Sequence, residues 1–458
     1  NFNSLPMNTS IFPAMESRRS LLLNFPLFLA LAIAGMAATA SAQTTYYWDG
    51  NGAATGSGAT TLAGNWGGGS ASAYWGTVAA GTSATTAAGL TSLDTAVFAA
   101  NDGSGAANNW NAAYIVTLGA AQSVNGLVIA GASVGSGNTG GNLTLAGTGS
   151  PGLTIGAGGV TVNGSNGDPT FAATLGTIIL GADQTWNVNN AHKYIVNAAV
   201  AGNATAGNTR TWTFGYLSPY TNDYAGVLSN GSGGGELAIT VNNFNGTSGG
   251  AGVQNISGVA NTFSGKTTIT RGILQIASLK NVGGGSSSLG AVTTVGNGTI
   301  DIGSGANSGA LHFNGSVAST SDRVINLAGS TGGATISSSG ATANTLTLTS
   351  NLTAAAGNKT LTLQGTNTGS NMISGIIGDP DVSTKINLVK SEAGRWILGG
   401  ANSYSGGTTI NGGTLSVGAS GTLGQNVVGN NVTIAGGNLL FSADSNVGSN
   451  QTITITAA

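Results

Sequence analysis

One stretch of this chain occurs twice. One copy, Asn402–Val417, has the sequence NSYSGGTTINGGTLSV, and an earlier copy, Asn261–Ile276, has the sequence NTFSGKTTITRGILQI. Aligned without a gap, the copies are identical at half of their positions. Each contains two short runs of alternating polar and apolar residues, separated by a turn with glycine. Such runs predict two short strands joined by a tight turn.

A further match follows both copies in the same order. GALHF (Gly309–Phe313) follows the first copy, and GNLLF (Gly437–Phe441) follows the second at a shorter spacing. The difference falls in loops rich in glycine and serine. A unit that keeps its strands while its loops vary is typical of a repeat architecture.

The composition excludes several other classes of protein. The 79 glycines among 458 residues disfavour long helices, since each interior glycine costs about 1 kcal/mol relative to alanine. A net charge of −2 gives no electrostatic footprint for nucleic acid or for an anionic membrane. There is no cysteine, so disulfides do not stabilise the chain. The core must therefore be built continuously along the sequence.

From about Tyr114 the chain is a series of short strand-like runs separated by Gly, Asn and Ser. Hairpins, a sandwich or a stack of parallel coils would each accommodate such runs. The recurrence of one unit with variable loops favours the stack, so we predict an all-β fold, a right-handed parallel β-helix (β-solenoid). Val, Ile and Leu should point inward, and Thr, Ser and Asn outward or into ladders between coils. Coils of about 20 residues, spaced about 4.8 Å apart, would give on the order of 20 coils.

The repeated stretch resembles the autotransporter-associated β-strand repeat, also called the passenger-associated transport repeat. The fullest match is Leu388–Leu423, and the first copy lacks the upstream lysine and Gly-x-x-x-Leu of the pattern. Lys266 and Arg271 also replace the glycines found at positions 407 and 412. The positions that carry the resemblance are Lys390, Gly394, Leu398, Asn402, Tyr404, Gly406, Thr408, Gly412, Gly413, Thr414 and Leu415, with Asn261, Phe263, Gly265 and Thr267 in the first copy.

Four segments are expected along the chain. Residues 1–42 form a secretory signal peptide: Arg18 and Arg19 precede the apolar run LFLALAIAGMAA, and the small-residue pattern Ala40–Ala42 follows. Met15 is the better start. Residues 43–112 are expected to form an N-terminal cap region, where Trp48, Trp66, Trp75 and Trp110 gather. An exposed aromatic platform for carbohydrate is the alternative for these tryptophans. Residues 113–260 should form a solenoid of degenerate repeats, and residues 261–458 a solenoid with the recognisable repeat.

Few residues in the sequence suggest a catalytic or ligand-binding site. SGKT (Ser264–Thr267) lacks the upstream glycine that a phosphate-binding loop needs, because Ala260 stands there. GDPD (Gly378–Asp381) suggests a polar turn, with a calcium site as the alternative. His192 and His312 are expected to be structural. A parallel β-helix lyase or hydrolase needs acids and bases gathered on one face, whereas the charged residues here are few and scattered.

The resemblance implies a non-enzymatic passenger of a bacterial autotransporter-like protein, secreted or held at the cell surface in association with the outer membrane. Its role would be structural or adhesive, with cell-surface glycans or sister chains as partners and with no cofactor, metal or nucleic acid. The alternative is a secreted β-helix enzyme acting on polysaccharide. QTITIT (Gln451–Thr456) ends the sequence as an uncapped strand, so we expect further repeats and then an outer-membrane translocator or a surface anchor beyond residue 458.

Overall fold

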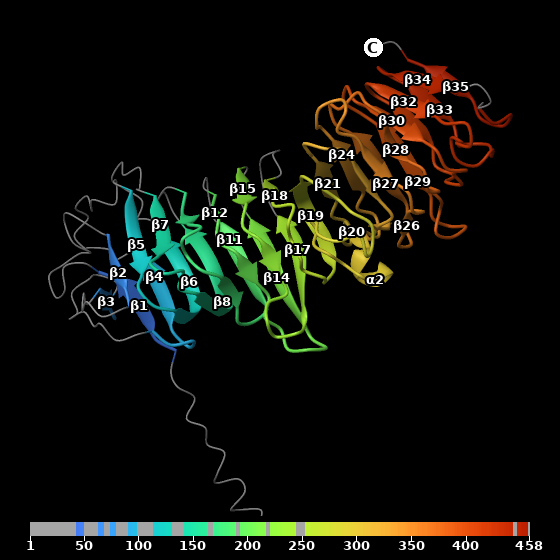
Figure 1. Cartoon of the computed structure of the whole chain (residues 1–458). Helices are drawn as coiled ribbons and strands as arrows, with labels where there is room; N and C mark the ends of the chain where they lie inside the picture. Colours follow the sequence, from blue (N-terminus) through green and yellow to red (C-terminus); the bar gives the residue numbers. More distant parts are fainter. Residues whose placement is uncertain are drawn as a thin grey trace, which may run out of the picture. The chain divides into compact units, whose positions relative to one another are not determined.

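The computed structural model describes residues 43–49, 63–67, 74–78, 90–98, 113–130, 142–163, 168–188, 193–216, 220–243, 252–442 and 447–456. Within these ranges the chain is almost entirely β, and its one helix is the single turn α2 (Val295–Gly298). The predicted signal peptide, Trp110 and His192 lie outside the described residues. The all-β parallel architecture predicted from the sequence is confirmed: the strands stack coil upon coil in parallel rows (Figure 1).

The longest row, here called row 3, contains fifteen strands within the described residues, each paired in parallel with the next. Its members are β2 (Gly64–Trp66), β5 (Tyr114–Leu118), β7 (Leu143–Gly147), β9 (Thr170–Phe171), β12 (Ile195–Val196), β15 (Thr221–Tyr224), β18 (Val253–Ile256), the second half of β19 (Thr267–Ile276), β21 (Gly309–Phe313), β24 (Ala334–Ser338), β27 (Lys359–Gln364), β29 (Ile386–Lys390), β31 (Thr408–Ile410), β33 (Val432–Ile434) and β35 (Ile453–Ile455).

Row 1 precedes row 3 within each coil from β1 to β26. It contains β1 (Thr45–Trp48), β4 (Thr95–Phe98), the second halves of β6 (Gln122–Ala130) and β8 (Leu153–Asn163), β11 (Gln184–Val188), β14 (Thr209–Tyr216), β17 (Glu236–Asn243), the first half of β19, β20 (Ile300–Ile302), β23 (Ile325–Leu327) and β26 (Thr353–Ala354).

Two shorter rows occupy different lengths of the chain. Row 2 contains the first halves of β6 and β8, then β10 (Ile178–Leu180), β13 (Val200–Ala201) and β16 (Leu228–Ser229). Row 4 begins later, with β22 (Ser319–Ser321), β25 (Leu346–Leu348), β28 (Asn371–Ile373), β30 (Arg395–Leu398), β32 (Thr414–Val417) and β34 (Asn438–Phe441). Row 2 strands thus end before row 4 strands begin.

Coil length varies along the chain. Ile239 pairs with Thr267 of the next coil, whereas Leu388 pairs with Thr408, a shorter step along the sequence. The step from Gly272 to its register partner Gly309 is longer than either. Because most coils are longer than the sequence analysis expected, row 3 has fewer strands within the described residues than the predicted number of coils.

The core runs along the inside of the coils. In β17 the side chains of Leu237, Ile239 and Val241 are fully buried and alternate with partly exposed neighbours on the outer face. A strand whose side chains alternate between two faces can bury one complete face, so each coil contributes a short apolar strip to one continuous core. Stability should therefore be a sum over coils and their interfaces.

Aromatic rings are packed in two places in the core. In the predicted cap region Trp48, Trp66, Trp75 and Phe98 are buried with ring centroids 5.0–5.9 Å apart. Buried rings cannot serve as an exposed platform for a sugar. The strands here, β1, β2 and β4, belong to rows 1 and 3, and the departure is β3 (Trp75–Gly76), which pairs antiparallel to β1.

A second aromatic group, which the sequence analysis did not anticipate, lies further along. Trp186, Trp212, Tyr194 and Tyr224 are fully buried on successive coils, and the Trp186 and Trp212 ring centroids are 4.8 Å apart. The hydroxyl groups of Tyr194 and Tyr224 are hydrogen bonded to each other. Large rings therefore fill the interior of these coils.

Candidate functional site

The two motif asparagines make the same cross-coil contacts. Asn261 Oδ1 accepts a hydrogen bond from the Leu228 N–H (2.9 Å), and its Nδ2 donates to the Ser288 carbonyl (2.9 Å). Asn402 Oδ1 accepts from the Ile377 N–H (2.8 Å), and its Nδ2 donates to Thr422 O (2.8 Å). Each amide therefore joins the coil before it to the coil after it. A buried amide with both ends satisfied fixes the relative position of three consecutive coils.

The other motif positions are also equivalent in the two copies. Phe263 and Tyr404 are fully buried, and Tyr404 shares a 2.7 Å hydrogen bond with Thr408 Oγ1. The N–H groups of Gly265 and Gly406 donate to the carbonyls of Leu237 and Ile386 in the preceding coils. The remaining matched pairs are Thr267 with Thr408, Leu274 with Leu415, and Gly272 with Gly413; the first two pairs are buried and the third has positive φ.

The upstream part of the second copy is held by a different kind of contact, in which a buried cation donates to backbone carbonyls. Lys390 is fully buried at the end of β29, and its Nζ donates to the carbonyls of Ser391, Glu392 (2.8 Å) and Gly412 (3.1 Å). Burial lowers the pKa of Lys390 to about 8, and the charge of Glu392 opposes this shift. Gly394, Leu398 and Thr414 lie on the same two coils, where Leu398 is buried and the Thr414 N–H donates to Gly394 O. Lys390 thus holds a corner between two coils together.

Two further buried cations act in the same way and were not singled out from the sequence. Lys359 Nζ donates to Gly329 O (2.6 Å) and to the carbonyls of two residues in its own coil. The Arg323 guanidinium donates to the carbonyls of Lys280 (3.2 Å), Leu289 (2.7 Å) and Gly290 (3.1 Å). Burial lowers the pKa of Arg323 to about 10, against the opposing charge of Asp322. The sequence did contain a signal for these two residues: each is an isolated Lys or Arg next to a strand-like run, in a chain with few charged residues.

The sequence analysis also did not single out a glycine that follows each copy of the motif. Gly290 and Gly424 both have positive φ, 72° and 75°. A Cβ at either position would collide with the carbonyl oxygen of the motif aromatic, Phe263 or Tyr404. The signal was present as a Leu-Gly pair, Leu289–Gly290 and Leu423–Gly424. Only glycine combines this backbone conformation with so close an approach.

Although these local contacts match, the two copies occupy different rows. Thr267–Ile269 pairs in row 1 and Ile273–Ile276 in row 3. Their counterparts pair in row 3 (Thr408–Ile410) and row 4 (Thr414–Val417). The later matched segments follow the same shift, because Leu311 pairs with Leu274 in row 3 and Leu439 with Leu415 in row 4. The second copy of the motif is therefore displaced by one side of the coil relative to the first copy, from rows 1 and 3 to rows 3 and 4.

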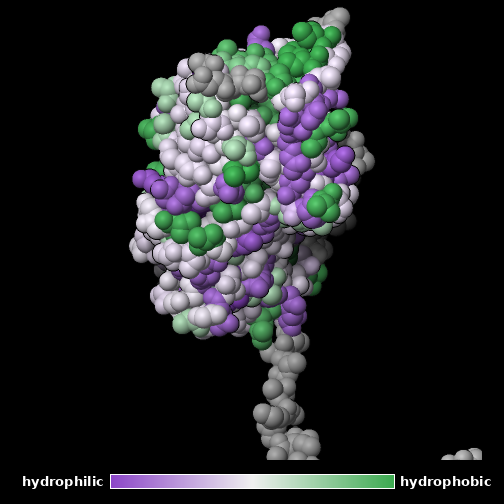
Figure 2. All heavy atoms as spheres, turned by 90° about the vertical axis from the view of Figure 1, so that its right-hand side faces the viewer, coloured by the Kyte–Doolittle hydropathy of each residue, from purple (hydrophilic) through white to green (hydrophobic). Residues whose placement is uncertain are grey.

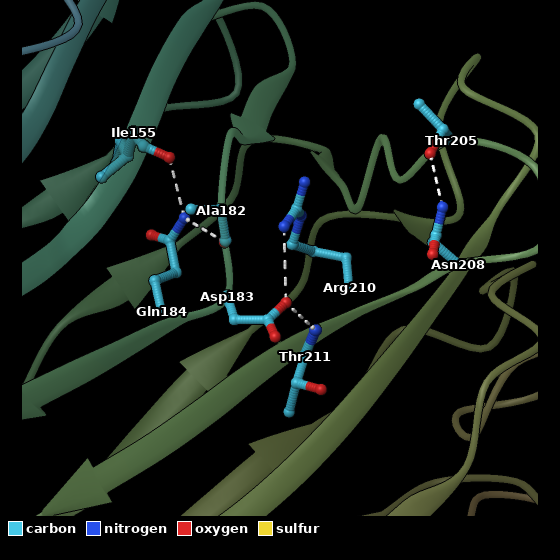
Figure 3. A network of polar contacts seen from close by, with 8 residues as sticks. All are labelled: Ile155, Ala182, Asp183, Gln184, Thr205, Asn208, Arg210 and Thr211. Atoms are coloured by element: carbon cyan, nitrogen blue, oxygen red, sulfur yellow. Dashed lines mark hydrogen bonds and ion pairs between the residues drawn. The ribbon is translucent and has the colours of Figure 1, made fainter. Parts of the chain in front are cut away.

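Several charged side chains lie in or beside the strands of row 1, and the enzyme alternative requires acids and bases gathered on one face. Figure 3 shows Asp183 Oδ1 accepting from Arg210 Nη1 (3.4 Å) and from the Thr211 N–H (3.0 Å) of the next coil. In the same view Gln184 Nε2 reaches back to Ile155 O (2.8 Å) and Asn208 bonds Thr205 within one loop. Asp183 and Gln184 therefore join coils to one another.

The next charges along the same face are also paired. Lys266 Nζ lies 2.6 Å from Asp301 Oδ2, and Glu236 accepts a 2.7 Å hydrogen bond from Asn297 in α2. General acid-base chemistry requires groups free to face a substrate. Here each acid named is engaged by a side chain from a neighbouring coil. Lys266 of the SGKT stretch is thus part of an ion pair between coils.

The GDPD turn is stabilised by its own carboxylates. Asp379 accepts from the Ile386 and Ser405 N–H groups (2.8 and 2.9 Å). Asp381 accepts from Ser383 and Thr384, and these bonds, chiefly the one from the Ser383 hydroxyl, lower its pKa. Carboxylates committed to backbone N–H groups favour the polar turn over a calcium site. Among the described residues no three His, Asp or Glu side chains gather as metal ligands.

His312 lies in β21 between the buried residues Leu311 and Phe313 and points to the opposite face. Burial lowers the pKa of the imidazole, with an opposing contribution from the charge of Glu392. His312 pairs in register with Gln275 on one side and Ser337 on the other. It is therefore one member of a polar column along row 3.

The outer face of row 3 carries a small trough lined by hydroxyl groups. Its volume is about 250 Å³, and it lies over β24, β27 and the loops that lead into β21 and β24. Its lining residues are Ser308, Thr331, Gly333, Ala334, Thr335, Thr360 and Thr362. None of the residues that line the trough is charged.

Figure 2, a view of the side with the C-terminal coils, is dominated by the near-white of weakly polar residues, and green is most continuous at the top, near β34 and β35.

In the parts of the chain that the structure describes, no helix is long and apolar enough to cross a membrane.

Comparison with known proteins finds one repeat family. The family model described as the passenger-associated-transport repeat matches residues 249–276 and 388–417. The adhesin BmaC autotransporter of Brucella suis biovar 1 (strain 1330) is 38% identical over 78 residues. That match covers 17% of this chain and 2% of the length of the relative. No solved structure matches.

Proposed function

Because the chain contains two copies of the passenger-associated-transport repeat, we propose that it is a non-enzymatic passenger displayed at a bacterial cell surface. The observation that carries the proposal is the role of the repeat residues. Asn261, Asn402 and Lys390 bridge consecutive coils, so the repeat builds a stack rather than a reaction centre. The stack presents the outer faces of its rows to the surroundings.

The finer proposal is adhesion, to glycans on another cell or to sister chains. It is supported by a similarity to an adhesin over 78 residues and by a largely uncharged outer surface rich in Thr, Ser and Asn. The local fold is suited to this role because polar side chains face outward at regular intervals along each row. Export across the outer membrane, through a translocator encoded outside residues 1–458, belongs to the same proposal.

Surface labelling tests the passenger role. An antibody raised against the purified chain should label intact cells of the bacterium that encodes it, and a protease added to those cells should remove the label. Deletion of the gene should reduce attachment to host cells, and re-expression should restore it. Label that appears only after the cells are lysed would contradict display, and attachment unchanged by deletion would contradict adhesion.

An assay for polysaccharide cleavage tests the non-enzymatic part. The purified chain should release no unsaturated or reducing sugar ends from acidic or neutral polysaccharides, with or without calcium. The pairing of Asp183, Asp301 and Glu236 with neighbouring side chains supports this expectation. Release of sugar ends that is abolished by an Asp301→Asn substitution would instead favour the β-helix enzyme.

A further inference from the structure

The hydroxyl trough on row 3 has a regular construction. Thr335 in β24 pairs in register with Thr362 in β27, which places their side chains in one outward column about 4.8 Å apart. Thr360 lies two positions before Thr362 and therefore projects from the same face about 6.6 Å along the strand. The Ser308 hydroxyl, at the rim, accepts a 2.9 Å hydrogen bond from the Gly333 N–H. The side chains thus form a small two-dimensional grid.

The threonine hydroxyls of this grid have no hydrogen-bond partner among the residues that the structure describes. No hydrogen bond engages the side chains of Thr331, Thr335, Thr360 or Thr362 in the described part of the chain, although the last three are half-buried. Elsewhere the chain uses threonine hydroxyls internally, as in the donations from Thr270 to Val241 O and from Thr422 to Asn402 O. Half-buried hydroxyls aimed into a hollow require water or a ligand to satisfy them.

The chemistry of the trough limits that ligand. None of its lining residues is charged, so it offers no cation to pair with a carboxylate, sulfate or phosphate group. It also lacks the aromatic or large aliphatic side chain that anchors a protein partner. What it offers is hydroxyl groups that both donate and accept, set beside threonine methyl groups and the floor formed by Gly333 and Ala334. A neutral sugar presents the complementary mixture of hydroxyl and C–H groups.

The column continues beyond the trough. Thr362 pairs with Val389, Val389 with Thr409, and Thr409 with Thr433, so small β-branched side chains follow one another coil by coil. A linear ligand lying parallel to the stack would meet an equivalent step at each coil. The trough is the part of this column where the surface is hollowed, so a sugar bound there would make more contacts than elsewhere along the column.

We propose that the trough is a binding site for a neutral glycan, an uncharged saccharide chain that lies across β24 and β27 and follows the threonine column. The proposal rests on the proposed adhesive function and names its ligand class and location. Because the trough is shallow, a single contact should be weak, and attachment of a cell should depend on many displayed chains acting together.

The test compares two matched double variants of the full chain. Thr335→Val with Thr362→Val removes two trough hydroxyls while keeping the β-branched shape. Thr213→Val with Thr240→Val makes the same change in a register pair on the outer face of row 1. The probes are neutral hexaoses (cello-, manno- and galacto-), with oligogalacturonate and heparin fragments as the charged probes. Binding is measured by calorimetry or saturation-transfer NMR.

We expect the natural chain to bind at least one neutral hexaose and neither charged probe. The Thr335/Thr362 variant should lose affinity by tenfold or more, and the Thr213/Thr240 variant should bind as the natural chain does, with equal thermal unfolding of all three. No binding of any neutral probe, equal loss in both variants, or preference for a charged probe would each overturn the site.

Cell attachment separates this site from the proposed function. Cells that display the Thr335/Thr362 variant and attach like the natural strain would keep the adhesive function and reject the trough. Conversely, neutral-sugar binding through the trough in a protein whose deletion leaves attachment unchanged would keep the site and reject the adhesive function.

Discussion

The coils around Asn261 and those around Asn402 are built by the same contacts at different coil lengths. The step from Ile239 to its register partner Thr267 is longer than the step from Leu388 to Thr408. Yet both asparagines bridge three coils, and both motif aromatics are buried beneath a positive-φ glycine. The motif thus specifies how one coil sits on the next. It does not specify the side of the coil on which its strands lie.

The segment between the copies accounts for the shift of one row. Residues 277–299 form an insertion that lengthens the coil after the first copy. The first strand of row 4, β22, follows this insertion in the sequence. The Leu279 N–H donates to Ser319 Oγ (3.2 Å), and Arg323 reaches the carbonyls of Leu289 and Gly290. A side of the coil can therefore be exchanged where polar groups satisfy the backbone of the inserted segment.

The largest expected effect tests whether the two regions share one kind of core. Leu274→Ala and Leu415→Ala should each cost about 2–5 kcal/mol, because both side chains are fully buried at matched positions. Hydrogen exchange and limited proteolysis should show loss of protection around the mutated coil and its neighbours, with distant coils spared. Uniform loss of protection along the chain would instead indicate a single globular core.

The sequence allowed much of this to be predicted, and the limits have a physical cause. Alternation predicted the buried faces of Ile410 and Leu415, and the motif identified Asn402, Tyr404 and Gly406 as structural positions. Row membership was not predictable, because it depends on the length of each coil, which loops alter without changing the strands. The role of Arg323 was hidden for the same reason, since its carbonyl partners lie in a distant part of the sequence, at Lys280, Leu289 and Gly290.

Disrupting the junction should separate the two regions. Arg323→Met keeps approximately the volume of the side chain but removes the donors to three carbonyls, two of them buried, at a cost of about 3 kcal/mol. We expect the unfolding transition to broaden or split, with faster exchange at residues 279–290, whereas Lys266→Met on the surface should change little. A single transition as sharp as that of the natural chain would show that the junction does not depend on Arg323.

A smaller effect compares the two asparagine bridges. Asn261→Ala and Asn402→Ala each leave a buried N–H and a buried carbonyl without a partner, at a cost of about 1–3 kcal/mol. Because the contacts are the same, the two losses measured by denaturant unfolding should agree within a factor of two. A substantial loss for one variant and none for the other would contradict the equivalence of the copies.

A further expected effect is a dependence of stability on pH that arises in the second region. Because burial lowers the pKa of Lys390 to about 8, below the unfolded value of about 10.4, the folded state binds fewer protons than the unfolded state between these values. The unfolding free energy of the natural chain, relative to Lys390→Met, should therefore rise as the pH increases from about 8 to about 10.4. A flat or falling difference over this window would contradict the depressed pKa.

The displacement of the motif by one row is tested most directly by disulfide cross-linking, which is unambiguous in a chain without native cysteine. Thr362 lies beside Val389 in row 3, and Ile397 projects from row 4. We predict that Thr362→Cys with Val389→Cys forms a disulfide on mild oxidation, because register neighbours are within bridging distance. Thr362→Cys with Ile397→Cys should remain reduced. If the second pair forms the bond and the first does not, the second copy lies in the same rows as the first, and the displacement is wrong.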